Sequence, residues 1–359
     1  MQRGAICKWW HACSETDRGH VRRPVFDPSA RSRLTPCMRA LRFSRTGSLD
    51  FLGVADVAVP VTTGSELLVK VEAAAVNPSD PKNVLGRMHE TTLPRTPGRD
   101  FAGVVVQGPA DWMGRGVFGT GGDLGFGRDG SHAEFLAVPR EAAVAIPRGL
   151  TFEQAAGIGL PYLTASAAIV LGAQLRRGET VLVLGTNGAV GSAAARLARR
   201  IEARVIGVVR KKADLARAGS LPVEAWIDLE STGLAEGCRA LTSGAGADVV
   251  FDTVGGALFE ACLGAVARRG RQVSIASAGT PRVTFNLVDF YHNESRLIGV
   301  DSLKWGFSEA AQVLRDLVPA FESKELPAPE VQVEALERGP EIYRLVDGGT
   351  VRGKIVLSP

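Results

Sequence analysis

Cysteine is scarce in this chain, with five residues in 359, and none lies between Cys37 and Cys238. Because the number is odd and no two cysteines form a C-x-x-C pair, the sequence argues against a disulfide framework and for a reducing compartment. Cys7, His11 and Cys13 lie close together and could be considered as metal ligands. The segment around them has no helix or strand pattern, so we interpret them as incidental.

Long apolar runs are also lacking, since none approaches the roughly 20 residues that a membrane helix needs. Charge of one sign is not in excess either. The formal net charge is +4, and residues 1–37 carry all of it, with seven basic and three acidic residues. The remainder is neutral, with 35 of each kind. The core therefore gives no electrostatic reason to bind nucleic acid or an anionic membrane.

Residues 1–37 differ from the rest of the chain. They combine Trp9-Trp10, several prolines and many arginines without periodicity, and the first strand-like pattern begins at Met38. No apolar secretory core is present, and acidic residues make the segment a poor match to an organelle transit peptide. We expect a disordered upstream extension, with Met38 as the natural first residue and a cytoplasmic location.

The most informative stretch is Thr180–Gly191, T-V-L-V-L-G-T-N-G-A-V-G. Aliphatic and β-branched residues predict a buried parallel strand that breaks at Gly185, and Gly188 and Gly191 precede an alanine-rich helix. Backbone N–H groups at such a helix start favour a phosphate, and the missing Cβ atoms let it approach. The alternative is a tight strand–helix turn with no ligand.

The next strand pattern, Arg204–Val209, ends about 20 residues past the glycines. An NAD-binding fold usually presents an acidic residue there to the ribose 2′-hydroxyl, whereas this chain has Arg210-Lys211-Lys212. A guanidinium can hold a 2′-phosphate with two hydrogen bonds, so the predicted cofactor is NADPH. The alternative is a solvated basic strand end.

Two patterns of secondary structure divide the chain. Between residues 38 and 150, short strands separated by Gly and Pro predict a small, mostly antiparallel β-barrel-like domain. From residue 151 to 300, a helix at 151–171 precedes alternating strands and helices, which predict a doubly wound parallel sheet. Helices at 212–219 and 257–268 are among the elements that we expect there. Residues 301–359 contain a helix and a closing strand, and we expect them to return to the first domain. The predicted fold class is therefore α/β with a β-barrel domain.

Several motifs, in order, resemble the medium-chain dehydrogenase/reductase superfamily and, within it, the zinc-free quinone oxidoreductases. They are A-A-A-V-N-P-S-D (73–80), P-G-R-D-F-A-G-V-V (97–105), D-G-S-H-A-E-F-L-A-V-P (129–139), the glycine turn, F-D-T-V-G-G (251–256) and R-G-K-I-V (352–356). The resemblance implies a GroES-like catalytic domain interrupted by a Rossmann domain, with the active site between them. It also implies a homodimer or homotetramer, with 297–301 near the subunit contact.

The chain departs from the zinc-dependent branch of that superfamily at each metal position. Gly98-Arg99-Asp100 stands where those enzymes carry G-H-E, and the cysteine expected in 77–80 is absent. The four-cysteine structural lobe is missing as well. Without thiolates and imidazoles at tetrahedral spacing, neither zinc site can be built, so we predict no metal.

The resemblance implies a substrate pocket lined by the polar residues Asn77, Ser79, Asp80 and Lys82, with Asn77 near the nicotinamide. The Lys82 ammonium would stabilise the enolate that forms when hydride adds to an enone or quinone. Solvent, His89 and His132 are alternative proton donors. Lys82 as a plain surface lysine, and the two histidines as ordinary hydrogen-bonded residues, remain alternatives.

The resemblance also implies cofactor contacts beyond the glycine turn, and the backbone of 274–278 is expected to reach the nicotinamide ribose. For Asp252-Thr253 the alternative is a helix cap. The predicted cofactor-binding residues are Thr164, Gly185, Asn187, Gly188, Ala189, Val190, Gly191, Arg210, Lys211, Asp252, Thr253, Val254, Gly255 and Ser277.

Together these observations predict an NADPH-dependent, metal-free reductase of quinones or α,β-unsaturated carbonyl compounds, protonated by Lys82 or water. Its expected partner is a small molecule, with no nucleic acid or membrane. One alternative is an enoyl-thioester reductase, for which Arg87, Arg95 and Arg99 would offer a basic approach to coenzyme A phosphates. A second alternative is a non-catalytic NADPH-binding protein.

Overall fold

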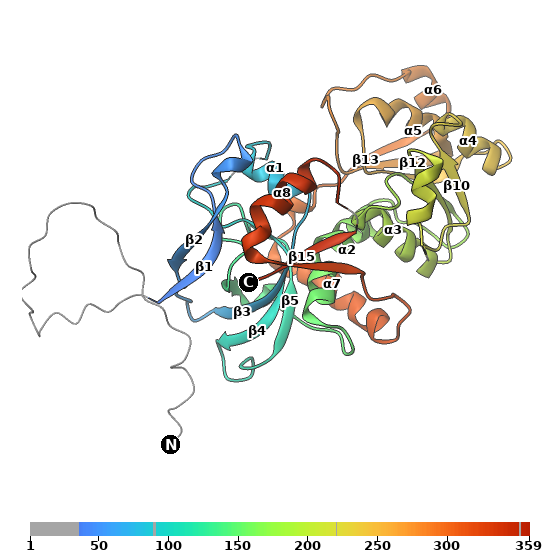
Figure 1. Ribbon diagram of the computed structural model, residues 1–359. Helices are drawn as coiled ribbons and strands as arrows, with labels where there is room; N and C mark the ends of the chain where they lie inside the picture. The colour runs from blue at the N-terminus through green and yellow to red at the C-terminus, as the bar shows by residue number, and fades with distance from the viewer. Residues whose placement is uncertain (1–35, 89–90, 220, 352) are drawn as a thin grey trace, which may run out of the picture.

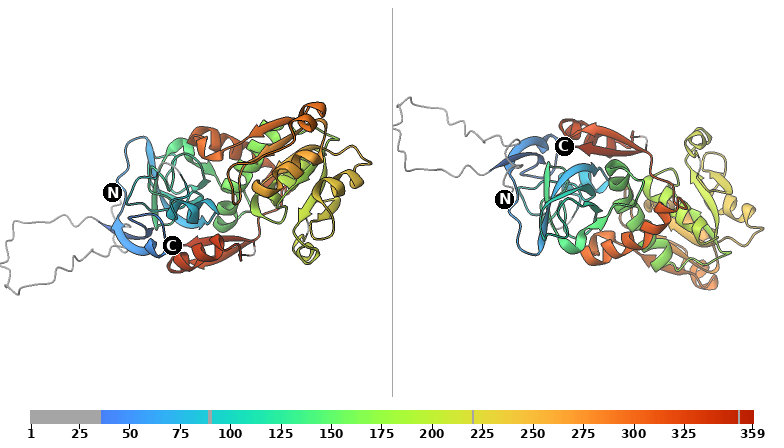
Figure 2. Two further views of the ribbon diagram at one scale, coloured as in Figure 1. Left: turned by 90° about the horizontal axis from the view of Figure 1, so that it is seen from above. Right: turned by 90° about the horizontal axis from the view of Figure 1, so that it is seen from below.

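The computed structural model describes residues 36–88, 91–219, 221–351 and 353–359. Two lobes are joined along a central helical layer, and the two further views show the same elongated arrangement (Figures 1 and 2). The blue and cyan N-terminal strands share one lobe with the red C-terminal strands, whereas the green-yellow to orange elements form the other lobe. Two predictions fall on residues that the structure does not describe. They are the disordered extension, over residues 1–35, and His89 as an alternative proton donor.

The first lobe is built on a seven-stranded sheet with the order β14-β15-β3-β4-β5-β7, in which β6 also pairs with β3. The closing strand β15 runs antiparallel to β3, with Val356 opposite Ala75, so the end of the chain completes this sheet. A separate antiparallel pair, β1 and β2, packs beside it. The strands are β1 (Cys37–Arg42), β2 (Gly53–Ala58), β3 (Glu66–Ala75), β4 (Phe101–Gln107), β5 (Gly116–Gly119), β6 (Phe135–Pro139), β7 (Val144–Ala145), β14 (Val331–Ala335) and β15 (Lys354–Ser358).

The second lobe is a six-stranded, fully parallel sheet with the order β10-β9-β8-β11-β12-β13. The chain starts at β8 in the middle and winds outward in both directions, which confirms the predicted doubly wound α/β fold. Its strands are β8 (Thr180–Val183), β9 (Arg204–Val209), β10 (Ala225–Asp228), β11 (Ala247–Asp252), β12 (Val266–Ser274) and β13 (Arg296–Gly299). Its helices are α3 (Ala189–Arg200), α4 (Leu234–Leu241), α5 (Phe259–Ala265) and α6 (Leu287–His292).

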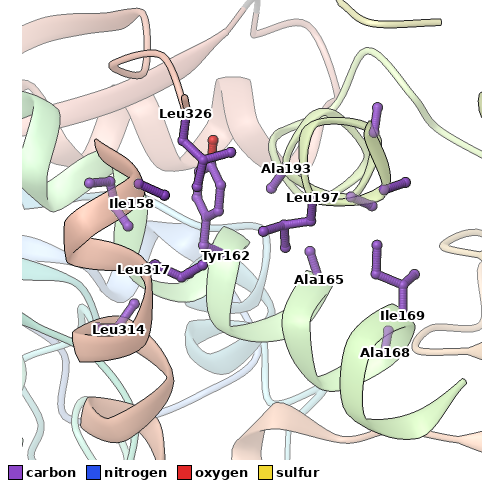
Figure 3. Packing of buried hydrophobic residues seen from close by; sticks show 14 of the residues in the cluster. Ile158, Tyr162, Ala165, Ala168, Ile169, Ala193, Leu197, Leu314, Leu317 and Leu326 are labelled. Carbon is purple, nitrogen blue, oxygen red and sulfur yellow. The ribbon is translucent and has the colours of Figure 1, made fainter. Parts of the chain in front are cut away.

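Helix α2 (Phe152–Ala165) connects the lobes. Thr151 caps it, since its side chain accepts from the Gln154 N–H while the Gln154 side chain accepts from the Thr151 N–H. A π-helical segment, Ser166–Gly172, continues it. Figure 3 shows Tyr162 and Ala165 of α2 packed between α3, which carries Ala193 and Leu197, and α7 (Phe307–Glu322), which carries Leu314 and Leu317.

The combined helix 152–172 corrects one sequence expectation. Its 21 residues are long and apolar enough to cross a membrane, although no apolar run of that kind was expected. Of its most apolar window, 83% is buried inside the protein. Burial against two neighbouring helices accounts for its composition, as for the core helix of a large domain.

Several short elements of the structure were not predicted from the sequence. The structure adds β2, β14, α1 (Ser79–Val84), α6 and α8 (Gly339–Asp347), all short. The helix expected at 212–219 is a 3₁₀ segment, and the helix expected at 257–268 ends at Ala265 because β12 begins at the next residue. Cys238 and Cys262 are free and buried. Cys37 is disulfide-bonded, a bond that the sequence argument against a disulfide framework did not foresee.

Candidate active site

The glycine turn lies between β8 and α3, at the carboxyl end of the central strand. Gly185 has a φ of 61°, which favours glycine. A Cβ on Gly191 would lie 2.3 Å from the Gly185 carbonyl oxygen, so the helix start packs directly on the turn. These constraints explain why the chain uses glycine at both positions.

The first turn of α3 presents unused donors. Gly188 is its N-cap and provides no side chain, and the N–H groups of Ala189, Val190 and Gly191 have no acceptor within the described residues. Such donors, at the positive end of the helix dipole, form a phosphate site. The Asn187 side-chain amide nitrogen donates to the Asp214 carbonyl at 2.8 Å. This hydrogen bond ties the glycine turn to the segment after β9.

Ligand clefts in proteins measure roughly 300 to 1,000 Å³, and one of 590 Å³ lies beside the start of α3. The second lobe contributes Asn187, Ala189 and Ser192 to it, whereas β15 contributes Lys354. The cleft therefore brings the glycine turn together with a residue of the first lobe. The residues present fit a dinucleotide phosphate at this position.

Arg210 and Lys211 directly follow β9, the strand beside β8. Both side chains are exposed, and no described residue forms an ion pair with either one. The Thr186 hydroxyl accepts from the Val208 N–H at 2.9 Å, which ties the glycine turn to the end of this strand. The two basic side chains therefore stand at the edge of the predicted adenosine site.

Asp252 and Thr253 are occupied by structural hydrogen bonds. The Asp252 carboxylate accepts from the N–H groups of Val254 and Gly255, at 3.0 and 2.7 Å, and from the Gln272 side chain. The Thr253 hydroxyl donates to the Leu184 carbonyl at 2.9 Å. These side chains hold the loop after β11 in place, but neither caps the following helices, whose N-cap residues are Gly255 and Leu258.

The loops after β11 and β12 are joined at the same edge of the sheet. The Ala278 N–H donates to the Val254 carbonyl at 2.7 Å. Ser277 is exposed, and its hydroxyl donates to the Thr280 carbonyl. In α2, the Thr164 hydroxyl donates to the Ser302 hydroxyl at 3.1 Å, just after β13. The structure thus gathers these predicted residues along the carboxyl ends of the strands, where open α/β sheets bind ligands.

In the first lobe, Asn77 and Asp80 belong to a buried polar cluster around Asp100. The Asp100 carboxylate is fully buried and accepts from the Leu160 N–H at 2.8 Å, from the Asn77 amide at 2.9 Å and from the Lys354 ammonium at 3.4 Å. The Lys354 ammonium also donates to the Asn77 carbonyl oxygen. The Asp80 carboxylate accepts from the Asn77 N–H at 2.7 Å. Strands β3, β4 and β15, with α2, position these groups.

Burial shifts the titration of this cluster. Desolvation raises the pKa of Asp80 to about 7, and the Asp100 charge adds to the increase. Asp80 therefore exchanges a proton near neutral pH. Desolvation also lowers the pKa of Lys354, while the charges of Asp100 and Asp80 oppose that decrease. A carboxyl that titrates near pH 7 is suited to proton transfer.

Lys82 does not join the cluster. It lies on the exposed side of α1, and within the described ranges it has no hydrogen bond or ion pair through its side chain. His132, the alternative donor, is fully buried beside Tyr343, with 2.8 Å between Nδ1 and the hydroxyl oxygen. Desolvation lowers the pKa of His132 to about 3, so the ring is neutral at physiological pH.

The residues present do not fit a zinc ion. Among the described residues, no group of three or more His, Cys, Asp and Glu side chains could hold a metal. The segment where the zinc-dependent branch carries a ligand histidine holds Arg99, a cation that repels a metal ion.

Sequence reasoning missed two members of the cluster, Asp100 and Lys354, which it named only within family motifs. It also missed Tyr343, the partner of His132. A signal existed for Lys354, because a lysine at the start of the apolar strand K-I-V-L is unusual unless its charge is paired.

Comparison with known families supports both lobes. The alcohol dehydrogenase GroES-like domain family matches residues 63–148, and the zinc-binding dehydrogenase family matches residues 189–318. A zinc-type alcohol dehydrogenase-like protein of Schizosaccharomyces pombe is 36% identical over 292 residues, covering 80% of this chain and 86% of that protein.

Two further relatives cover nearly the whole fold. The quinone oxidoreductase of Pongo abelii is 28% identical over 329 residues, with 89% of this chain and 97% of that protein covered. The crystal structure of an NAD-dependent alcohol dehydrogenase superposes with a TM-score of 0.81 at 28% identity, covering 90% of this chain and 100% of that one. The predicted GroES-like and Rossmann architecture is confirmed.

Proposed function

This chain belongs to the medium-chain dehydrogenase/reductase superfamily, in its quinone oxidoreductase-like branch, and we propose that it is an NADPH-dependent reductase of quinones or α,β-unsaturated carbonyl compounds. The observation that carries the proposal is the cleft lined both by Asn187 and Ala189, at the start of α3 in the second lobe, and by Lys354 of the first lobe. A nicotinamide cofactor, when bound, supplies hydride for the reduction of a carbonyl-conjugated double bond.

The chain's own residues would hold that cofactor at three places. The N–H groups that open α3 would bind the pyrophosphate, and Arg210 with Lys211 would bind the 2′-phosphate. The backbone of 274–278 and Thr164 would border the nicotinamide ribose. Gly255 has a φ of 65°, and its missing Cβ lets the loop after β11 pack against the Ala276 carbonyl. This contact keeps the loops after β11 and β12 together beside the proposed cofactor site.

Replacing Arg210 with alanine is expected to lower the preference for NADPH over NADH by about 10- to 100-fold, since a charge-assisted hydrogen bond is lost. Binding of NADH should stay within about twofold, because its ribose carries no 2′-phosphate. Cofactor titration by fluorescence measures both constants. Arg199→Ala serves as the control, because Arg199 is also exposed near this lobe's edge but pairs with Glu224. Equal losses for NADPH and NADH would contradict the assignment.

On the substrate side we propose that Asn77 and Asp80 form one wall of the pocket and that the product takes its proton from Lys82 or water. The pKa of Asp80, about 7, supports a group that can exchange protons there. Lys82 is exposed on α1, so a proton from its ammonium or from nearby water reaches the pocket from the solvent side.

The enoyl-thioester alternative gains no support from the three arginines considered for it. Arg87 pairs with Asp347 at 3.2 Å, Arg95 pairs with Asp129 at 3.0 Å, and Arg99 is buried. They do not form an exposed basic patch, which the phosphates of coenzyme A would need.

The function is tested by NADPH oxidation at 340 nm by metal-chelated protein, with 9,10-phenanthrenequinone and cyclohexenone as acceptors. We expect turnover that survives chelation and prefers NADPH. The Lys82→Ala variant separates the proton donors, since turnover falls if the ammonium donates and stays unchanged if water does. Binding of NADPH without reduction of either acceptor would leave the non-catalytic alternative in place of this proposal.

We further propose a homodimer, or a tetramer built from dimers, assembled through β13. This strand is at the edge of the sheet, and Leu297 on it is 40% exposed. The neighbouring helix α6 exposes Leu287, Val288 and Tyr291. An apolar surface beside an open strand edge is suited to pairing with a second copy. Light scattering would give a multiple of 37.9 kDa, and a monomer mass would contradict this.

A further inference from the structure

Arg99 is the largest fully buried side chain among the described residues, with 1% of its surface exposed. Its only hydrogen bond in the described part of the chain runs from Nη2 to the Ser302 carbonyl, at 3.5 Å. Its Nε atom is buried without an acceptor. A guanidinium has five N–H donors, so most of its capacity is unused.

No carboxylate in the described residues pairs with this cation. Both oxygens of the adjacent Asp100 accept from other groups, as described above, and none of the ion pairs among the described residues includes Arg99. Desolvation lowers the pKa of Arg99, while the more distant charges of Asp100, Asp80 and Asp301 oppose the decrease. A buried charge without a partner is costly for stability, and proteins that keep one commonly use it at a functional site.

Two other buried polar atoms without a hydrogen-bond partner belong to residues that pack against Gly98, the residue before Arg99. Gly98 packs against Ser131 and His132, since a Cβ on it would lie 2.6 Å from atoms of each. Ser131 Oγ and His132 Nε2 are both buried without an acceptor or donor in the described residues. The Arg99 guanidinium also lies 5.8 Å from the centre of the Phe126 ring. The Arg99 side chain itself therefore has one weak acceptor, the Ser302 carbonyl, and one aromatic neighbour, Phe126, in the described part of the chain.

The position of Arg99 relates it to the cofactor side of the fold. Its hydrogen-bond acceptor, Ser302, follows the carboxyl end of β13 and also accepts from Thr164. Ligands of open α/β sheets bind in the crevice at those strand ends. Arg99 therefore reaches from the first lobe to the edge where the nicotinamide would lie, and the weak 3.5 Å hydrogen bond is one that a substrate oxygen can replace.

We propose that Arg99 binds the carbonyl oxygen of the substrate and stabilises the oxyanion that forms on it, an inference that rests on the proposed function. The β-carbon accepts hydride with both electrons from the dihydronicotinamide, which is oxidised. The double-bond pair moves toward the carbonyl, and the carbonyl π pair moves onto oxygen. Two N–H donors of a guanidinium fit that planar oxyanion. A proton from Lys82 or water then completes the reduction at the α-carbon.

This role separates Arg99 from Lys82. An exposed ammonium acts through solvent, which weakens its field, whereas a buried guanidinium acts in a medium of low dielectric constant. The charge that costs stability in the free protein is thus the one that favours the transition state. The substrate class that follows is an oxygen-conjugated acceptor, an enone or a quinone, whose reduction leaves negative charge on oxygen.

The test compares Arg99→Met with Arg99→Lys. Methionine keeps the length and apolar stem but removes the charge, so kcat/KM with cyclohexenone, which has the β-carbon that this step requires, is expected to fall by about 100- to 1,000-fold. The melting temperature should stay equal or rise, because a desolvated cation is lost. Lysine should retain part of the activity, and the Kd for NADPH should be unchanged in both. Arg148→Met, which removes an exposed arginine paired with Glu322, is the control.

A second measurement is independent of turnover. With NADP⁺ present, the unmutated chain should bind 4-nitrophenol as its anion and move the midpoint of its ionisation to lower pH, as followed at 400 nm. Arg99→Met should not. Equal phenolate binding by both proteins, or equal kcat/KM, would overturn the role of Arg99. Failure of the unmutated chain to reduce either acceptor would instead refute the proposed function, and phenolate binding would still decide on Arg99.

Discussion

Replacing Asp100 with alanine is expected to destabilise the protein by about 3–5 kcal/mol, because it leaves a buried charge without its partner. The Asp100 carboxylate accepts from Leu160, Asn77 and Lys354, which belong to α2, the loop after β3 and β15. Its loss would leave three buried donors without this acceptor, one of them charged. Urea unfolding followed by circular dichroism measures the change.

Two comparisons make this result specific. Asp123→Ala removes an exposed carboxylate that pairs with Arg128 at 3.6 Å, and it should cost less than about 1 kcal/mol. The double variant Asp100→Ala/Lys354→Met should be more stable than Asp100→Ala alone, since it also removes the unpaired cation. A loss below about 1 kcal/mol for Asp100→Ala would show that the cluster does not depend on this carboxylate.

Replacing Gly191 with alanine is expected to weaken NADPH binding by about 100-fold or more and to destabilise the fold by about 1–3 kcal/mol. The added Cβ would lie 2.3 Å from the Gly185 carbonyl oxygen and 2.8 Å from the Thr186 Cα. Both neighbours are backbone atoms, so the turn must open and its N–H donors must change direction. Fluorescence titration of NADPH and thermal unfolding measure the two effects.

Other glycines provide matched controls for this prediction. A Cβ on Gly188 would meet only the Gly185 carbonyl oxygen, at 3.2 Å, so Gly188→Ala should leave stability nearly unchanged while crowding the phosphate. Gly53 has no atom within 4 Å of an added Cβ, and Gly53→Ala should affect neither property. Unchanged NADPH binding in Gly191→Ala would mean that the glycine turn is not the phosphate site.

The glycine turn and the parallel sheet were predictable because each depends on a local pattern. Strands β8 and β9 are continuous aliphatic runs, and Gly185 stands at the point where a positive φ is required. The short elements α1 and β14 were not predicted, since α1 packs on α8 and β14 pairs with β15, which are elements distant from them or later in the chain. The helix expected beyond Ala265 failed for the same reason, because pairing with β11 makes Val266–Ser274 a strand. Helix α6 has six residues, too few to show a helical period.

The predicted substrate-pocket residues also divide into those that local sequence placed correctly and those that it did not. Asn77 and Asp80 were expected in the pocket, and the structure places both in a buried cluster. Lys82 was chosen from the same segment, yet it lies on the exposed face of α1, because a helix rotates about 100° per residue and so places Lys82 on the side opposite Asp80. The family motif identified residues 77–82 as the pocket segment, whereas the rotation of helix α1 decided which of their side chains are buried.

By itself, the sequence determined the two-lobed α/β class, the position of the glycine turn, the basic pair after β9 and the lack of zinc ligands. These features follow from composition, periodicity and residue type over a few consecutive positions. The tertiary structure was needed to show that Lys354 meets Asp100 and that Arg99 is buried without a partner among the described residues. Those facts depend on residues up to 254 positions apart, which no local pattern relates.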